Sequence, residues 1–301
     1  MRGLLVCACL ALVASVVADV PWEMTLPNHS PIIVYEPYSD GTDPSKGWSV
    51  WTTEDGFLKE GGSDANGEIR HVTSLNRASF TLDFWGTGIT LTGVTNASYE
   101  VVLDGGDAEV QTTETTLFSQ DNLKLGDHIL TLTLTNTSDN RMIGFVDAII
   151  ATSSPSAVKS TVYPSYDDNS DIEYTGTWEP IAIPQGVWQS TSEYRASVSL
   201  KFSNARAVAI HSPLNWGHWV YSIEVDSHIK LPANDAPFNA SDFWLIRDSI
   251  LYFQDNLDPS KDHTIRMTNL AQNPSNETWW WMTFTSFEVW KVEGADNNNG
   301  G

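Results

Sequence analysis

Aromatic rings beside a few hydrogen-bond donors are the residues of this chain with the most evident chemistry. The sequence holds 13 Trp and 7 His, and the stretch Ser212–Trp219, read as SPLNWGHW, places Trp216, His218 and Trp219 in one segment. A loop this aromatic is seldom made only to face water, because large exposed apolar patches usually mark a binding surface. The segment therefore predicts the wall of a binding pocket.

Further site candidates follow from the same reasoning. A second segment ends in FWLIRD, and a run of three Trp follows later, in which the strand period sends the first and third ring to one face. We predict that Trp rings shape an apolar pocket and that an Arg or His polarises a ligand carbonyl. The catalytic candidates are Arg247, His218 and Tyr252, and the substrate-binding candidates are Trp216, Trp219, Trp279, Trp281, Arg70 and His71.

Each candidate also has a structural interpretation that the sequence leaves open. His218 could cap its own loop, Arg247 could pair with Asp248 or Glu224, and Tyr252 could belong to the core. The three consecutive Trp could be buried on both faces, for instance at a contact between two domains.

Several classes of chemistry lack their motifs. The sequence contains no Gly-rich phosphate loop, no His-Glu-x-x-His and no Gly-x-Ser-x-Gly. The two cysteines, Cys7 and Cys9, lie in the first 18 residues. Hydrolysis by a Ser, Cys or zinc centre is therefore not expected, whereas a pair of glycosidase carboxylates stays possible among 38 acidic residues.

Two acidic clusters, Asp40–Asp43 and Asp167–Asp171, could supply oxygen ligands to calcium, or could form Asx-turns. We predict no catalytic metal and no cofactor. The formal net charge of −22 makes nucleic acid and anionic membranes poor partners.

The first 18 residues, MRGLLVCACLALVASVVA, predict a secretory signal peptide. No later stretch approaches the about 20 continuous apolar residues of a membrane helix, so we expect a secreted or secretory-lumen protein without a membrane anchor. Sequons that predict N-glycosylation in that compartment occur at Asn28, Asn96, Asn136, Asn239 and Asn276.

Alternating apolar and polar residues, punctuated by Gly, Pro, Asn and Asp, predict an all-β chain of antiparallel strands. The pattern occurs twice. Arg77-Ala-Ser matches Arg195-Ala-Ser, and QDNL at 120–123 returns at 254–257. We predict two tandem β-sandwich domains at 30–152 and 160–293, a linker at 151–160 and a disordered tail at 294–301. QDNL itself is interpreted as a turn whose Leu enters the core.

These repeats resemble the galactose-binding-like β-sandwich, or jelly-roll, repeats of fungal secreted and cell-surface proteins. The resemblance rests on Tyr166–Asp168 with Gly176–Trp178, on Ser79–Ile89, on Val101–Gly105 and on Leu123–Leu130. It implies a sandwich fold and carbohydrate binding, with Trp rings as platforms for sugar faces. The second copy departs from the pattern, mainly by its two insertions at 212–219 and 230–249.

In its overall character the chain is also similar to fungal intermolecular hetero-Diels–Alderases of tropolone sesquiterpenoid biosynthesis. That resemblance implies a cofactor-free pericyclase that joins a tropolone quinone methide to a humulene-type terpene, with apolar small molecules as partners. The alternative is a non-catalytic carbohydrate-binding protein whose partners are glycans. Aromatic residues that converge on a closed cleft between the domains would favour the first function, and an open aromatic platform would favour the second.

Overall fold

The computed structural model describes residues 20–57, 61–107, 109–111, 115–136, 141–154, 156–166, 171–184, 186–272 and 280–293. The predicted signal peptide and the predicted tail lie outside these ranges. The described part is built of β-strands and turns, without a helix, which confirms the all-β prediction. Accordingly, it offers no helix of the length and apolarity needed to cross a membrane.

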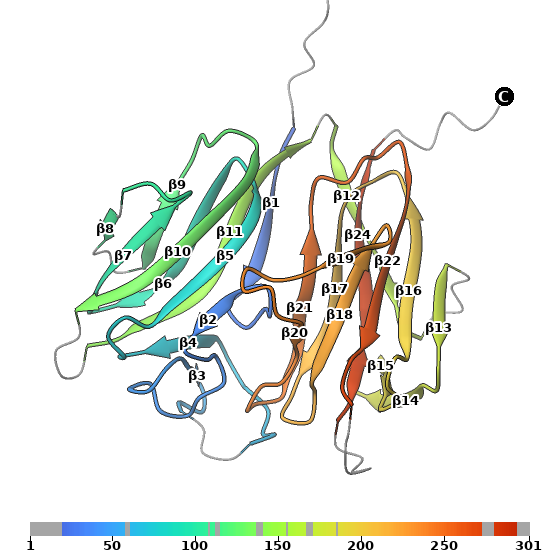
Figure 1. Cartoon of the computed structure of the whole chain (residues 1–301), viewed down its shortest axis with the longest axis horizontal. Helices are drawn as coiled ribbons and strands as arrows, with labels where there is room; N and C mark the ends of the chain where they lie inside the picture. Colours follow the sequence, from blue (N-terminus) through green and yellow to red (C-terminus); the bar gives the residue numbers. More distant parts are fainter. Residues whose placement is uncertain are drawn as a thin grey trace, which may run out of the picture.

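The first half of the chain forms two antiparallel sheets that face each other (Figure 1). In one, β1 (Val20–Pro27) pairs with β11, and the remaining strands lie in the order β3 (Ser49–Thr52), β4 (Ile69–Thr73), β11 (Ile143–Ser154), β6 (Gly88–Thr95) and β9 (Thr116–Gln120). The other has the order β2 (Val34–Glu36), β5 (Ser79–Gly86), β10 (Gly126–Asn136), β7 (Ser98–Leu103) and β8 (Glu109–Gln111).

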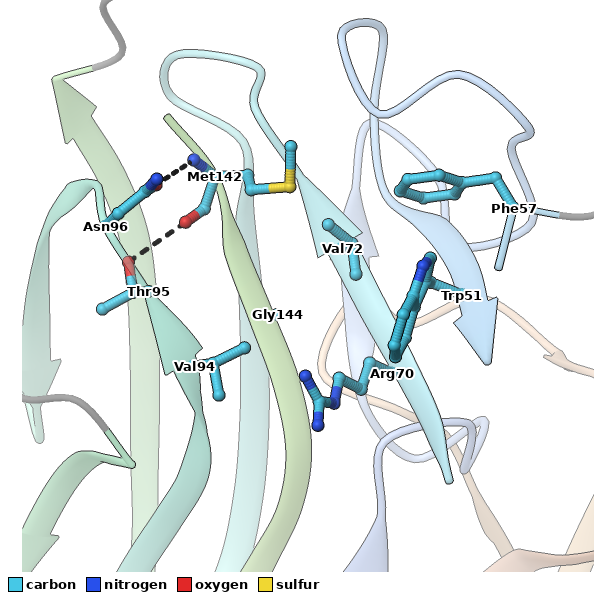
Figure 2. A pocket seen from close by; sticks show the side chains of 9 residues that line it. All are labelled: Trp51, Phe57, Arg70, Val72, Val94, Thr95, Asn96, Met142 and Gly144. Carbon is cyan, nitrogen blue, oxygen red and sulfur yellow. Dashed lines mark hydrogen bonds between the residues drawn. The ribbon is translucent and has the colours of Figure 1, made fainter. Parts of the chain in front are cut away.

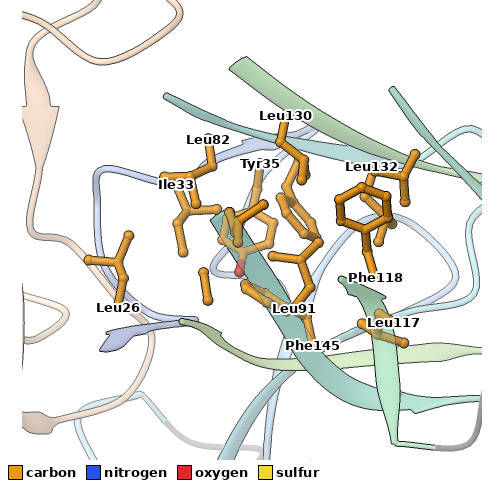
Figure 3. Close-up of a cluster of buried hydrophobic side chains, with 14 of the residues drawn as sticks. Leu26, Ile33, Tyr35, Leu82, Leu91, Leu117, Phe118, Leu130, Leu132 and Phe145 are labelled. Atoms are coloured by element: carbon orange, nitrogen blue, oxygen red, sulfur yellow. The ribbon is translucent and has the colours of Figure 1, made fainter. Parts of the chain in front are cut away.

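The core of this first sandwich follows from the period-two pattern of its strands. In β5 the apolar residues Phe80, Leu82 and Phe84 alternate with less buried positions. Phe80 stacks on Phe145 of the opposite sheet, with ring centroids 4.6 Å apart. Figure 3 shows Leu and Phe side chains from both sheets filling this space.

The second half forms a second sandwich. One sheet has the order β12 (Val158–Pro164), β24 (Ser286–Val292), β17 (Ala205–Leu214) and β21 (Ile246–Gln254). The facing sheet has the order β13 (Ile172–Thr175), β16 (Ser197–Ser203), β22 (Asp262–Asn269), β18 (Val220–Val225) and β19 (His228–Lys230), with β20 (Phe238–Asn239) on β18. A small third sheet joins β14 (Glu179–Ile183), β15 (Gly186–Thr191) and β23 (Met282–Phe284).

The strand orders show the duplication directly. In the first half β11, β6 and β9 are neighbours, and in the second half β24, β17 and β21 take the same places. The facing sheets repeat in the same way, with β2-β5-β10-β7-β8 matching β13-β16-β22-β18-β19. The predicted pair of tandem sandwiches is therefore confirmed.

The QDNL segments lie at equivalent turns. Asn122 and Asn256 both have left-handed backbone, with φ of 60° and 64°, a conformation that Asn tolerates better than most residues. Leu257 is buried, and Leu123 packs against the core of its own sandwich. Each QDNL segment is therefore a turn whose Leu packs in the core, as predicted.

The boundaries of the two sandwiches differ from the predicted ones. The first sandwich begins before residue 30, because β1 pairs with β11 along its whole length. The predicted linker is mostly strand, since β11 continues to Ser154 and β12 begins at Val158. Small polar residues in this stretch suggested a loop, but hydrogen bonding to β1 and β24 keeps them extended.

The two sandwiches pack against each other through apolar and polar contacts. Trp22 of β1 lies against Phe253 and Trp290 of the second sandwich, with centroids 6.4 and 6.0 Å away. Backbone hydrogen bonds also cross the boundary, from Ala65 to Leu245 and from Leu245 to Ser63.

Candidate functional site

A groove of about 420 Å³ lies on the outer face of the sheet that holds β3, β4, β11 and β6. Figure 2 shows side chains from these strands and from the loops that hold Phe57, Asn96 and Met142 around it. Its lining residues are Trp51, Phe57, Arg70, Val72, Val94, Thr95, Asn96, Met142 and Gly144.

The floor of the groove is a row of three residues on adjacent strands. Gly144 of β11 is the register partner of Val72 on β4 and of Val94 on β6. Because Gly144 has no side chain, the row dips between the two valines. A Cβ added at Gly144 would meet their Cγ2 atoms at 3.5 and 3.4 Å, which is ordinary contact, so a methyl group fits at this position.

One wall of the groove combines an aromatic ring with a cation. Trp51 of β3 is the register partner of Arg70 on β4, and the Arg70 guanidinium carbon lies 5.0 Å from the Trp51 ring centroid. Glu68 fixes the other side of this guanidinium, since its Oε1 accepts from Nε at 2.5 Å. The ring and Glu68 together hold Arg70 in a defined position at the groove.

The opposite rim is held by hydrogen bonds to the backbone of Met142, which Figure 2 draws as dashed lines. The Met142 amide donates to Asn96 Oδ1 at 2.7 Å, and Thr95 Oγ1 donates to the Met142 carbonyl oxygen at 3.3 Å. Met142 is thereby fixed beside the groove, with its side chain partly exposed.

The lining determines what the groove can do. Its described residues present hydrocarbon, one guanidinium and two short polar side chains, and they include no carboxylate and no His. Such a set can bind a ligand with an apolar face and a few acceptor groups. It supplies no group that exchanges a proton near neutral pH.

The predicted catalytic residues do not share a pocket. His218 is buried, with Nδ1 2.9 Å from the Pro213 carbonyl oxygen and Nε2 3.0 Å from Thr283 Oγ1. Burial lowers its pKa to about 4, against the opposing effect of the bond to Pro213. His218 therefore stabilises its own loop, which was the structural alternative.

Arg247 and Tyr252 are also engaged in structural contacts. Arg247 forms an ion pair with Asp64 of the first sandwich at 2.8 Å, and not with Asp248 or Glu224. Tyr252 is buried and its hydroxyl donates to Gln254 Oε1 at 2.8 Å. The three predicted catalytic residues are thus not brought together, because each is bound to a different structural partner.

Tyr252 lies instead beside a cleft of about 290 Å³ between the two sandwiches. The same cleft is lined by three carboxylates, of which Asp83 of β5 and Asp127 of β10 lie on adjacent strands. Burial raises the pKa of Asp83, and the charge of Asp127 raises it further. The order of residues in the sequence did not single out this pair.

The predicted tryptophans form an open surface. Trp216 is 60% exposed and stands edge-on to Phe243, and the exposed ring of Trp219 stacks on Trp280 at 5.0 Å. Trp281 is half-buried, and its amide donates to the Gly217 carbonyl oxygen at 2.8 Å. Trp279 lies outside the described residues. None of the described rings in this set lines the groove or the clefts between the sandwiches.

Arg70 and His71, predicted together as donors from the first domain, point to opposite faces of β4. Arg70 lines the groove, whereas His71 is 1% exposed and stacks on Tyr35 at 4.6 Å. Consecutive strand residues alternate between faces, so both could not serve one surface.

The five sequons differ in their environments. Asn96 and Asn239 are exposed, while Asn276 and the side chain of Asn136 lie outside the described part. Asn28 is buried and its Nδ2 donates to the carbonyl oxygens of Ile69 and Val146 at 2.8 and 2.7 Å. The folded chain leaves no room for a glycan on Asn28, so that predicted site is wrong.

The acidic cluster at 40–43 forms a turn. Asp43 Oδ1 accepts from the Ser45 amide at 3.0 Å and from its hydroxyl at 2.6 Å. Most of the second cluster, residues 167–170, lies outside the described ranges. Within those ranges no three His, Cys, Asp or Glu side chains gather in a way that could hold a metal ion.

Sequence reasoning missed most of the groove. Trp51 was counted among the tryptophans without a role, and Gly144 and Met142 carried no signal. The pairing of β3 with β4 and the bare glycine between two valines create the site, and neither is visible before the strands are aligned.

No protein-family model matches this chain, and the search of curated proteins gives no match. Among solved structures it is similar to a xanthan lyase from Paenibacillus, with 13% identity over 88% of this chain and a TM-score of 0.31. It is also similar to a tandem CBM22 domain from Paenibacillus barcinonensis Xyn10C, with 10% identity, 80% of this chain, 90% of that chain and a TM-score of 0.28.

A two-domain esterase active on acetylated mannans matches 44% of this chain with 16% identity and a TM-score of 0.30. The chain spans only 26% of the xanthan lyase and 37% of the esterase. Similarities with such low identities and TM-scores carry no functional argument. They lend no support to the resemblance to hetero-Diels–Alderases.

Proposed function

We propose that this protein binds carbohydrate without transforming it, and that the groove beside Trp51 and Arg70 holds the glycan. The observation that carries this proposal is the aromatic and cationic wall beside a shallow apolar trough. A pyranose has C–H faces that pack on aromatic and aliphatic side chains, and hydroxyls that bond to charged groups at the edge. Arg70, held in place by Glu68, supplies such a group.

Two further features support binding over catalysis. The described lining has no acid or base for proton transfer, and the predicted catalytic donors are bound elsewhere. The exposed ring of Trp219, stacked on Trp280, also supports sugar binding, because it offers an aromatic surface to solvent. With the predicted signal peptide, these features are consistent with a role outside the cell or in the secretory lumen.

The experiment is a glycan-array screen followed by calorimetric titration of the strongest binder. We expect Trp51→Ala to weaken binding at least tenfold, because it removes the ring and the support of Arg70. Trp216→Ala is the matched control, since Trp216 is more exposed and lies outside the groove. Unchanged affinity in the Trp51 variant, or loss only in the Trp216 variant, would contradict the assignment.

A second candidate function is the cofactor-free cycloaddition between a quinone methide and a humulene-type alkene. The hydrocarbon lining of the groove favours it, because two apolar molecules could be held together there while Arg70 donates to a carbonyl. The test is incubation of the purified protein with a quinone-methide precursor and humulenol. An adduct rate and stereochemical mixture equal to those without protein would exclude this function.

A further inference from the structure

Besides the cleft next to Tyr252, another cavity lies between the two sandwiches, away from the groove beside Trp51. It consists of an outer cleft of about 230 Å³ and a small inner chamber of about 30 Å³. The two spaces are continuous in their lining, since both are bounded by Pro31, Ile33, Tyr35, Ser39, Asn239 and Ser241. A cavity needs about 10–15 Å³ of such space to hold one water molecule, so the chamber has room for a hydroxyl group.

His71 contributes an unpartnered nitrogen to the chamber. The residue is 1% exposed and lines the chamber, and its Nε2 is buried without a hydrogen-bond partner. Burial lowers the pKa of His71 to about 3, the charge of His29 acts in the same direction, and the accepting backbone of Ser39 opposes both. A carbonyl oxygen cannot donate to Nε2.

The tautomer of His71 follows from its neighbour Asn28. Both hydrogens of the Asn28 amide are directed to backbone carbonyl oxygens, so its Oδ1 is the atom that faces His71 Nδ1 at 2.6 Å. Nδ1 must then carry the hydrogen and donate. In the neutral ring Nε2 is left as an acceptor, and it requires a donor from whatever enters the chamber.

Asp242 provides a second polar group in the same chamber. It is 3% exposed, and its Oδ1 accepts from the Trp244 amide at 2.9 Å. Burial raises the pKa of Asp242 to about 7, and the charge of Asp40 acts in the same direction. With this pKa Asp242 can carry a hydrogen, so one hydroxyl in the chamber can accept from Asp242 and donate to His71 Nε2.

The outer cleft has a mixed polar lining. Among its described lining residues there is no Lys, Arg or His, and Asp40 is the one carboxylate, so an anionic ligand has no counter-charge there. The remaining polar groups, on Tyr38, Ser39, Asn234, Asn239 and Ser241, include both donors and acceptors. That mixture suits hydroxyls, which also donate and accept.

We propose that this cleft is a second ligand site, which takes one neutral sugar unit with a hydroxyl inserted in the chamber as donor to His71 Nε2. This site goes beyond the proposed function and does not depend on it. The groove and the cleft have no lining residue in common, so each can be blocked alone.

The test follows the ¹⁵N resonance of His71 Nε2 by NMR while methyl glycosides of galactose, mannose, glucose and N-acetylglucosamine are added. The proposed site requires Asn239 without a glycan, so the protein is produced in a bacterial host that adds no N-glycans. At least one glycoside is expected to shift the resonance saturably, since a new hydrogen bond changes the electron density at Nε2.

Asn234→Trp plugs the mouth of the cleft at an exposed loop residue, and Asn234→Ser is its matched control. We expect the shift to vanish in the Trp variant and to persist in the Ser variant and in Trp51→Ala. A response to none of the four glycosides would overturn the proposal. A response that survives Asn234→Trp would also overturn it, because the ligand would then lie elsewhere.

Discussion

Arg70 and His71 illustrate how far a residue's neighbours decide its role. The two are adjacent in the chain and were predicted as partners in one site. The Arg70 guanidinium lies over Trp51 at the groove, and the His71 ring lies under Tyr35 on the opposite face of β4. Burial keeps His71 neutral, whereas Arg70 stays at the surface with Glu68.

His211 has the opposite electrostatic environment to His71. Its Nδ1 lies 3.3 Å from Asp248 Oδ1 and its Nε2 3.2 Å from Glu288 Oε2. Burial disfavours the charged ring, but the hydrogen bonds to Asp248 and Glu288 outweigh it and raise the pKa to about 9. The protonated ring therefore stabilises the folded chain at neutral pH.

We predict that His211→Gln lowers the free energy of unfolding in a pH-dependent way. A group whose pKa rises on folding contributes fully below its unfolded pKa of about 6.5, and this contribution disappears as pH rises through about 9. The stability difference between wild type and variant should be largest near pH 6 and smallest near pH 10. Urea unfolding across that range measures it, and a constant difference would contradict the ion-pair account.

At the scale of elements, the duplicated strands carry duplicated turn chemistry. Asp104 and Asp226 follow equivalent strands, have φ of 53° and 50°, and accept from the His at the start of the next long strand at 2.7 Å. Each also accepts a backbone amide at 2.9 Å. One Asp thus joins two neighbouring strands of each sandwich.

We predict that Asp104→Ala and Asp226→Ala each destabilise the protein by about 1–2 kcal/mol. Each change removes two hydrogen bonds and places Ala in left-handed backbone. Asp104→Asn is the control, because Asn keeps an acceptor and tolerates this conformation. The melting temperature should be highest for the wild type, lower for the Asn variant and lowest for the Ala variant. An Asn variant that melts as low as the Ala variant would argue against a contribution from the left-handed backbone.

The groove also depends on elements, since three strands supply its floor. Gly144→Val should fold, because a Cβ at this position meets only ordinary contacts and Val suits a strand. It should nevertheless lower glycan affinity at least tenfold by filling the trough. Calorimetric titration with a melting-temperature check tests this prediction, with Gly144→Ala as the smaller step. Full affinity in the Val variant would exclude the trough as the binding surface.

At the scale of the whole molecule, a buried ion pair of the second sandwich lies at the contact with the first. Arg206 and Asp255 are 8% and 5% exposed, and Nε lies 3.1 Å from Oδ1. Asp255 Oδ2 also accepts from Thr152 Oγ1 of the first sandwich at 2.8 Å. Asp255, the aspartate of the second QDNL segment, therefore contacts the first sandwich.

We predict that Asp255→Ala destabilises the protein by about 3–5 kcal/mol, because it leaves the Arg206 charge buried without its partner. Lys261→Ala serves as a surface control, since Lys261 forms an exposed pair with Asp258 that contributes little. Urea unfolding measures both. If both variants lower the free energy of unfolding by a similar, small amount, the buried Arg206 charge does not need Asp255 as its partner.

The sequence by itself determined the all-β class, the duplication and the structural role of QDNL, because these depend on residue periodicity and local turn preferences. The tertiary structure decided which residues meet. Val72, Val94 and Gly144 become one groove floor only through hydrogen bonding between distant strands. His71, His218 and Arg247 do not form the predicted site, because each is bound to a different partner in the folded chain. Pairing register and burial are properties of the whole chain, and no short stretch of sequence contains them.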